Sequence, residues 1–138
     1  MQRTLVLVKP NGVERGLVGE IIGRLERRGF AIKAARMLMV SEELASRHYA
    51  EHEGKGFYHD LIAFITSAPV FAMVVEGRSA ISVVRGMMGA TNPMDAAPGT
   101  VRGDFGLDTT QNLVHSSDSQ ESAEREIGLY FKSSDLVP

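Results

Sequence analysis

The chain has 138 residues, of which 43% are hydrophobic and 23% are charged, and it contains no cysteine. Disulfides, thiolate metal sites and cysteine nucleophiles are therefore excluded, and a formal net charge of −2 gives no general attraction to nucleic acid. No apolar run reaches membrane-spanning length and no basic leader with a cleavage site opens the chain, so we expect a cytoplasmic enzyme or binding protein.

The first part of the chain alternates between strand and helix patterns. A compact β-rich run at residues 4–8 predicts a buried strand. Apolar positions at helical spacing over residues 17–25 predict a helix, which Gly29 closes as a residue of left-handed conformation would. Alternating positions over residues 30–40 predict a second strand, and Ser41 with two acids behind it is a good helix start.

The same alternation continues to the C-terminus. A helix is predicted over residues 57–66, a third strand over 70–76 and a further helix over 79–88. A fourth strand leads to His115, and a last helix covers residues 119–131 with its apolar side toward the protein.

Residues 90–106 break this pattern. They contain prolines and glycines without apolar periodicity and are predicted to form a long loop, a kind of segment that often carries function. No linker is long or biased enough to divide the chain, so residues 1–138 are expected to form one domain.

The order of elements predicts an α/β fold of the α+β sandwich type. The best match is the ferredoxin-like split βαβ arrangement, a mainly antiparallel four-stranded sheet with helices packed on it. A doubly wound parallel sheet is the alternative, but its glycine-rich first turn is absent. Lys9-Pro10-Asn11-Gly12 follows the first strand and matches neither the dinucleotide nor the P-loop pattern.

The most informative stretch runs from Asn112 to Asp118. His115 follows two apolar residues and precedes a run of small polar residues, just before the last helix. The N-terminus of that helix has unpaired N–H groups and a partial positive charge. Such a position suits a nucleophile that meets phosphate. The alternative is an ordinary strand end, a polar turn and a helix cap.

Nucleotide phosphates, if bound, would have to be held by scattered side chains. The candidates are Lys9, Arg85, Thr91 and Arg102, each of which would otherwise be interpreted as an ordinary surface residue. The chain also lacks the catalytic-loop and metal-binding motifs of protein kinases.

Taken together, these residues resemble the nucleoside diphosphate kinase family over nearly the whole chain. The matching segments are, in order, Lys9-Pro10-Asn11-Gly12-Val13, Arg15 to Glu20, His48-Tyr49, Gly89 to Pro93, Pro98 to Asp104, the histidine motif and Glu121 to Leu129. Any one segment could arise by chance, whereas the complete ordered set is very specific.

The resemblance implies a ping-pong transfer of the γ-phosphate from a nucleoside triphosphate to a nucleoside diphosphate, through a phosphohistidine at His115. It implies that Glu126 orients the ring, that Ser117 steadies that carboxylate, and that Tyr49 completes the network. From residue pattern alone, Glu126 would be an exposed helix residue. The implied substrates are ATP, GTP and other nucleoside di- and triphosphates, with no requirement for nucleic acid or membrane.

The resemblance also assigns residues to the substrate. Arg85, Thr91 and Arg102 would hold the phosphates, with Mg²⁺ carried mainly by the nucleotide rather than by protein ligands. His52 lies where some family members place a histidine that contacts a phosphate. Lys9 and Asn112 would hold the ribose hydroxyls. The base would lie against Phe57, with Leu61 and Thr109 nearby. Stacking on an aromatic ring would not discriminate among bases. Ordinary core positions remain the alternative for Phe57 and Leu61.

Three residues depart from the family pattern. Ser116 stands where glycine is usual, so its side chain could crowd the ring or require an altered backbone. Asn11 replaces the commoner aspartate and Thr109 the commoner valine, and neither change should have a large effect.

Two other functions remain open. One is a non-catalytic binding module with the same fold, and the other is a phosphocarrier that receives phosphate on His115 from a protein donor. The resemblance further implies a homo-oligomer, with a hexamer slightly favoured over a tetramer. We expect the segment from Ala90 to Gly106 to be ordered by neighbouring subunits, because it has few apolar side chains with which to pack itself.

Overall fold

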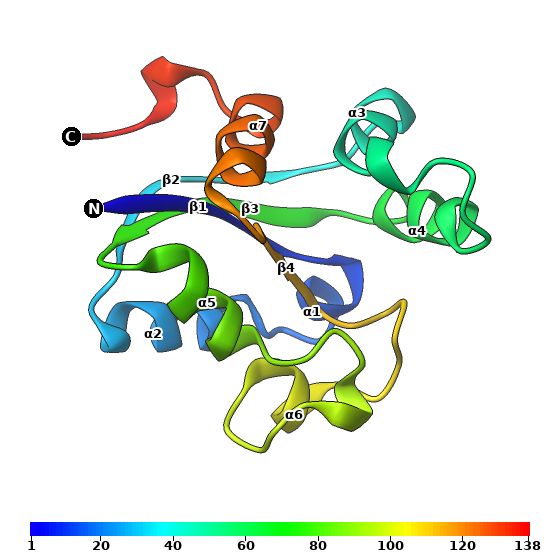
Figure 1. The fold of residues 1–138 in the computed structure, drawn as a ribbon, viewed down its shortest axis with the longest axis horizontal. Helices are drawn as coiled ribbons and strands as arrows, with labels where there is room; N and C mark the ends of the chain where they lie inside the picture. Colours follow the sequence, from blue (N-terminus) through cyan, green and yellow to red (C-terminus); the bar gives the residue numbers. More distant parts are fainter.

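A four-stranded sheet forms the centre of the computed structural model, which describes residues 1–138. Its strands are β1 (Gln2–Val8), β2 (Ala31–Leu38), β3 (Val70–Gly77) and β4 (Val114–Ser116), in the spatial order β2-β3-β1-β4 (Figure 1). Every neighbouring pair is antiparallel. The split βαβ prediction is confirmed, and the doubly wound parallel sheet is excluded.

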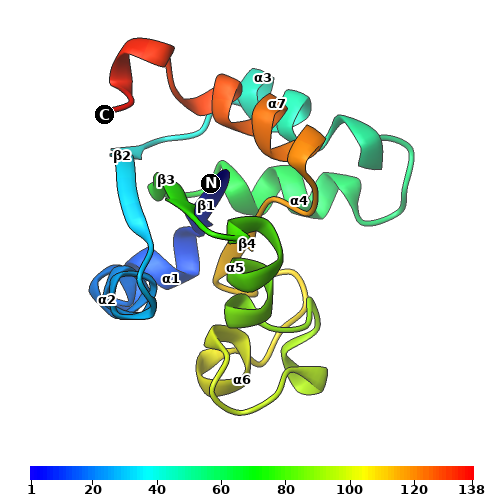
Figure 2. The ribbon, with the colours of Figure 1, turned by 60° about the vertical axis from the view of Figure 1, so that its left-hand side comes forward.

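Helices cover both faces of this sheet (Figures 1 and 2). One face carries α1 (Pro10–Glu14), α2 (Val18–Arg28), α5 (Ala80–Met88) and α6 (Val101–Phe105), and the other carries α3 (Glu42–His48), α4 (Tyr58–Ile65) and α7 (Gln120–Tyr130). Three single turns of 3₁₀-helix are η1 (Ala50–His52), η2 (Pro93–Asp95) and η3 (Ser133–Asp135). No helix combines the length and apolar character needed to cross a membrane.

Strand β1 shows why both faces must be covered. Its side chains alternate, so that Val6 and Val8 join the core beneath α2 and α5 while Leu5 and Leu7 join the core beneath α3, α4 and α7. All four side chains are fully buried. A strand buried on both faces needs apolar residues at successive positions, which explains the continuous apolar run in the sequence.

Several helix ends form as the sequence predicts. The Ser41 hydroxyl accepts a hydrogen bond from Leu44 N at 3.1 Å, and the Ser119 hydroxyl accepts one from Ser122 N at 3.0 Å. Gly29 ends α2 with φ of +106°. Ser79 does precede α5, but with φ of +51° and no capping bond from its side chain.

The predicted loop over residues 90–106 is wrong in part, because η2 and α6 lie within it. Each is a single short helical element held by its cap: the Asn92 side chain accepts from Met94 N, and the Thr100 hydroxyl accepts from Gly103 N. Elements of this length are too short to produce apolar periodicity, so the cap residues were their only sequence signal.

Contacts within the chain hold this segment against the rest of the protein. The Asp104 carboxylate accepts hydrogen bonds from Gly99 N and from Arg24 Nη2, both at 2.8 Å. Val101 is fully buried in the core beneath α2 and α5. The segment therefore has anchoring contacts within its own chain, despite its few apolar side chains.

Replacing Gly103 with alanine should destabilise the protein. The added Cβ would collide with the Ala97 carbonyl and lie 2.8 Å from the Thr100 hydroxyl. We expect the free energy of unfolding to fall by about 1–3 kcal/mol, the usual range for overpacking. Gly128→Ala is the matched control, because Gly128 lies exposed within α7 with no atom near the new Cβ, and it should be neutral or stabilising. Urea unfolding at one protein concentration measures both, and equal stability of the two variants would contradict a steric conflict at Gly103.

Candidate active site

His115 occupies the middle of β4, directly opposite Leu7 of β1. Because paired residues share a face of the sheet, its imidazole points toward α7 and α3, on the side of the core that contains Leu7. Its neighbour Val114 packs into the core on the opposite face. Pairing with β1 thus decides which helices the histidine meets.

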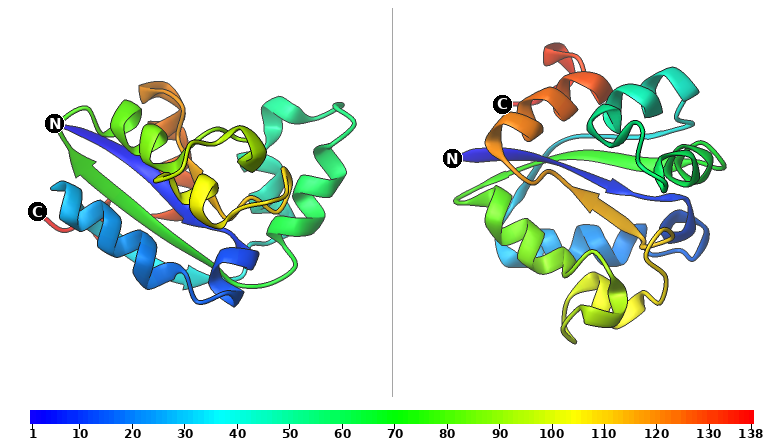
Figure 3. Two further views of the ribbon diagram at one scale, coloured as in Figure 1. Left: turned by 90° about the horizontal axis from the view of Figure 1, so that it is seen from below. Right: turned by 45° about the vertical axis from the view of Figure 1, so that its right-hand side comes forward.

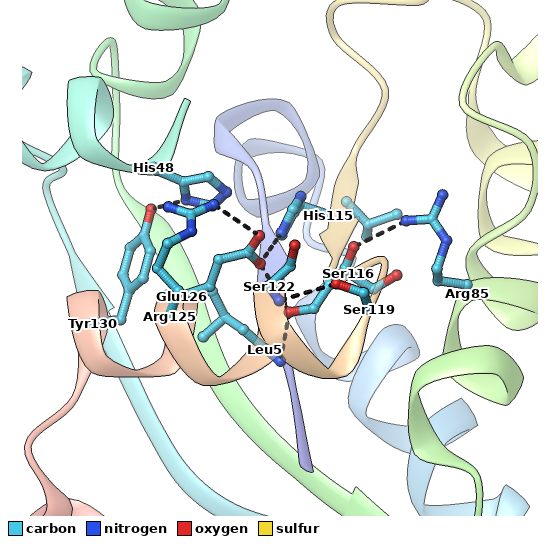
Figure 4. A network of polar contacts seen from close by, with 12 residues as sticks. Leu5, His48, Arg85, His115, Ser116, Ser119, Ser122, Arg125, Glu126 and Tyr130 are labelled. Carbon is cyan, nitrogen blue, oxygen red and sulfur yellow. Dashed lines mark hydrogen bonds and ion pairs between the residues drawn. The ribbon is translucent and has the colours of Figure 1, made fainter. Parts of the chain in front are cut away.

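Glu126 of α7 is the direct partner of this histidine (Figure 4). Its Oε1 lies 2.7 Å from His115 Nε2 and also accepts the Ser117 hydroxyl at 2.8 Å. The Ser117 oxygen in turn accepts Leu5 N at 3.2 Å. Because a carboxylate only accepts hydrogen bonds, Nε2 carries the proton and Nδ1 keeps its lone pair. Glu126 is 4% exposed, so it is not the surface residue that its position in the sequence indicates.

His48 of α3 is a member of this cluster that sequence analysis did not assign to the site. Its ring meets that of His115 edge-on, with centroids 4.6 Å apart, and its Nδ1 lies 2.8 Å from the Tyr130 hydroxyl. Its Nε2 is buried without a partner. Burial is the main reason that the pKa of His48 lies well below its usual value, and the charges of the nearby His115 and Lys9 lower it further. Its spacing from the buried Ala45, three residues earlier on α3, was the available signal.

A cleft of about 520 Å³ opens beside this cluster. All of the residues predicted for the site line it except Ser117, which lies behind His115 against Glu126. They come from both helical layers and from the segment before β4, as the right-hand view of Figure 3 shows for those elements. Lining residues that the sequence analysis did not assign to the site are His48, Glu51, Thr110, Ser116 and Asp118.

Lys9 lies at the base of the cleft and is 6% exposed. Its Nζ donates to Asn112 Oδ1 at 2.8 Å, and the Asn112 amide donates to Thr91 O at 3.0 Å. Burial, with the positive charge of Arg102 nearby, lowers the pKa of Lys9 to about 7. An anionic or hydroxyl-bearing ligand would find this donor already oriented.

Arg102 of α6 joins three segments through one side chain. Its guanidinium donates to Asn112 O at 3.2 Å, Gly89 O at 2.8 Å and Val114 O at 2.6 Å. A guanidinium has five N–H groups, so two remain without a partner in this residue, which lines the cleft. Burial and the nearby Arg85 lower the pKa of Arg102 to about 10.

Arg85 of α5 supplies a second guanidinium next to the histidine. It donates to Ser116 O at 3.3 Å and otherwise lies exposed at the cleft wall. Asp118 lies nearby. A hydrogen bond from the Ser122 side chain lowers the pKa of the Asp118 carboxyl group, and the charge of Arg85 lowers it further. The cations and His115 thus line one cleft from four parts of the chain, namely the end of β1, α5, α6 and β4.

The far end of the cleft contains Phe57, which is 47% exposed. The alternative that this ring is an ordinary core residue is therefore wrong. His52 lies beside it, with ring centroids 5.5 Å apart. Leu61 both lines the cleft and packs against the adjacent core, while Thr109 lies exposed at the rim.

Two further residues, Tyr49 and Ser116, also line the cleft. Tyr49 is buried beside His48 and lines the cleft, but it has no hydrogen bond to His115 or Glu126. Ser116 requires no altered backbone, because the only non-glycine residues with positive φ are Ser79 and Leu113. Leu113, at φ of +75°, takes the turn just before β4.

The chain is similar to known proteins over nearly its full length. The family model described as nucleoside diphosphate kinase matches residues 2–136. A nucleoside diphosphate kinase of Archaeoglobus fulgidus is 61% identical over 99% of this chain and 91% of the relative, and one of Desulforamulus reducens is 54% identical over 99% and 92%.

Solved structures give the same answer. A halophilic nucleoside diphosphate kinase from Halobacterium salinarum, determined with CDP, superposes with a TM-score of 0.97 at 52% identity and covers 99% of this chain and 91% of that one. The nucleoside diphosphate kinase of Aquifex aeolicus gives 0.96 at 40% identity, with 99% coverage of both chains. On sequence, fold and cleft alike, this chain belongs to the nucleoside diphosphate kinase family and is a phosphotransferase.

Proposed function

We propose that this chain moves the γ-phosphate of a nucleoside triphosphate to a nucleoside diphosphate through a phosphohistidine at His115. The observation that carries the proposal is the 2.7 Å contact between His115 Nε2 and the Glu126 carboxylate, from which we assign the proton to Nε2 and the free lone pair to Nδ1. A neutral imidazole needs no separate base to act as a nucleophile. We infer that Nδ1 is the atom that becomes phosphorylated.

In the first half-reaction, the Nδ1 lone pair forms a bond to the γ-phosphorus as the bond from phosphorus to the β,γ-bridging oxygen breaks. The nucleoside diphosphate leaves with that electron pair. Positive charge develops on the ring, and the adjacent Glu126 carboxylate offsets it in a buried position. The second half-reaction reverses these steps with a different diphosphate in the same cleft.

Arg85, Thr91 and the two free N–H groups of Arg102 are proposed to hold the phosphates while the transferred group carries charge on its peripheral oxygens. Lys9 and Asn112 would hold the ribose hydroxyls. Nucleoside diphosphate kinases act with a divalent metal, here proposed to be Mg²⁺. The ion is proposed to be held mainly by the nucleotide, whose charge it would neutralise.

The base is proposed to stack on Phe57, with Leu61 and Thr109 beside it and His52 toward the phosphates. A stacking surface without convergent polar groups accepts purines and pyrimidines alike.

A non-catalytic binding module is disfavoured by the free Nδ1. A phosphocarrier would have no use for the Lys9–Asn112 pair or for the exposed Phe57 ring.

Incubation with radiolabelled Mg-ATP and no acceptor should leave phosphate on His115. The bond should be acid-labile and alkali-stable, since protonation makes the imidazole a good leaving group. His115→Ala should abolish both labelling and transfer, whereas His59→Ala, which alters an exposed histidine of α4 outside the cleft, should keep both. Wild-type turnover by His115→Ala would refute the mechanism.

Phe57→Leu should weaken all nucleoside diphosphates together, because the stacking face is lost while an apolar side chain remains. We expect kcat/KM to fall by a factor that corresponds to about 1–3 kcal/mol for each base, and Phe57→Tyr should restore it. Discrimination by the wild type among ribo- and deoxyribonucleotides should stay within the same range. Competition assays that revealed a strong single-base preference would mean that the site recognises base edges.

We further propose that the protein is a homo-oligomer, with a hexamer slightly favoured over a tetramer, and that it is located in the cytoplasm. Strand β2 supports assembly, because it is an edge strand whose end exposes Met37 at 54% and whose next residues expose Met39 at 58%. An edge with unpaired backbone groups and exposed apolar side chains is a natural pairing surface.

Light scattering at micromolar concentration should therefore give a mass of six, or alternatively four, chains of 15.0 kDa. Met37→Lys with Met39→Lys should reduce the mass, because desolvated charge opposes pairing at this edge. A mass near 15.0 kDa for the wild type, with full activity, would contradict the assembly.

A further inference from the structure

Three ligand atoms from different elements meet beside the cleft. Two of them, on His115 and Glu126, belong to the pair proposed for phosphotransfer, whereas the third, on His48, has no part in that proposal. One nitrogen from His48, one from His115 and one carboxylate oxygen from Glu126 all lie within 4.8 Å of one another. They come from α3, β4 and α7 respectively. Figure 4 shows the His48 and His115 rings converging above the Glu126 carboxylate.

The second observation is the state of His48. The residue is 3% exposed, and its Nε2 is buried without any hydrogen-bond partner. An unpaired polar atom in such a position is uncommon and destabilising. His48 nevertheless lines the same cleft as His115 and Glu126.

We propose that His48, His115 and Glu126 form a binding site for a divalent transition-metal ion of the zinc class, in which the ion replaces the proton shared by His115 and Glu126. Two imidazoles and one carboxylate are a typical ligand set for such ions, and a fourth position would remain open to water. The set does not suit Mg²⁺, which prefers oxygen ligands in octahedral geometry. This site is thus separate from the nucleotide-held metal.

The surroundings of the cluster support metal binding. Tyr130 lies 2.8 Å from His48 Nδ1, where its hydroxyl can accept that N–H and orient the ring so that Nε2 faces the ion. Ser117 does the same for the Glu126 carboxylate. Outer partners of this kind are usual at zinc sites. Bonds of about 2.1 Å at a tetrahedral angle place two ligand atoms about 3.4 Å apart, so closing the site from separations of up to 4.8 Å takes a shift of at most roughly 1.4 Å.

A bound ion would suppress phosphotransfer, a consequence that rests on the proposed role of His115. Coordination of Nε2 withdraws electron density from the ring and makes Nδ1 a poorer nucleophile. It also removes Glu126 as the group that offsets charge on the ring. Occupied by a transition metal, the site would act as an inhibitory one.

The test titrates the full-length protein with Zn²⁺ alone, and with Co²⁺ as a spectroscopic probe, in the absence of nucleotide. We expect one ion per chain and visible Co²⁺ bands of nitrogen coordination. His48→Phe keeps an aromatic ring without a ligand and should weaken Zn²⁺ binding at least about tenfold. Glu126→Gln should weaken it likewise and provides a second variant if His48→Phe fails to fold. His59→Ala is the matched control and should bind as the wild type does.

Activity measured at fixed Mg²⁺ and nucleotide should then fall with added Zn²⁺ in the wild type and in His59→Ala, and recover on chelation. Residual activity of His48→Phe should be insensitive to the same Zn²⁺ concentrations. Unchanged Zn²⁺ affinity in both His48→Phe and Glu126→Gln would overturn the proposal, as would a loss of affinity in His59→Ala. Because binding is measured without nucleotide, its failure would leave the phosphohistidine proposal intact, and failed labelling of His115 would leave the metal result intact.

Discussion

The antiparallel pairing of β4 with β1 is the constraint on which the site depends. It involves only three residue pairs, Val6 with Ser116, Leu7 with His115 and Val8 with Val114. Side chains alternate across a strand, so a shift of one residue would turn His115 away from Glu126 and toward the opposite core. The short strand is held at both ends: Arg102 donates to the carbonyls of Asn112 and Val114, and the backbone of Leu5 exchanges bonds with Ser117.

The position of β4 at the edge of the sheet explains how one cleft draws on both helical layers. Helices α3 and α7 supply His48 and Glu126 from one face, and α5 supplies Arg85 from the other. If β4 were a central strand, the thickness of the sheet would separate these groups. At the edge, the two layers can meet around the end of the strand.

The electrostatics of the cleft indicate an anionic ligand. Lys9 and Arg102 are largely buried cations whose pKa values are lowered by desolvation and by a neighbouring positive charge. Their hydrogen bonds to Asn112 and to backbone carbonyls offset part of that cost without neutralising the charge. Phosphate groups would supply a counter-charge to Arg102, and ribose hydroxyls would accept hydrogen bonds from Lys9, so ligand binding would offset part of the cost of burying these groups.

The sequence by itself determined the sheet type, the main helices and the identity of the family, because apolar periodicity and cap residues are local signals and the ordered motifs are specific. It also identified His115, Glu126 and the phosphate-facing cations as candidates, though mainly through resemblance. Single-turn elements such as α6 escaped it, since a few residues cannot display a period. Only the tertiary structure decided that Phe57 is exposed, that Tyr49 makes no bond to the histidine, and that His48 stands against His115 with a free nitrogen. It alone also decided which nitrogen of His115 is free, because that depends on an oxygen of α7 brought within 2.7 Å by the packing of a helix on a strand edge.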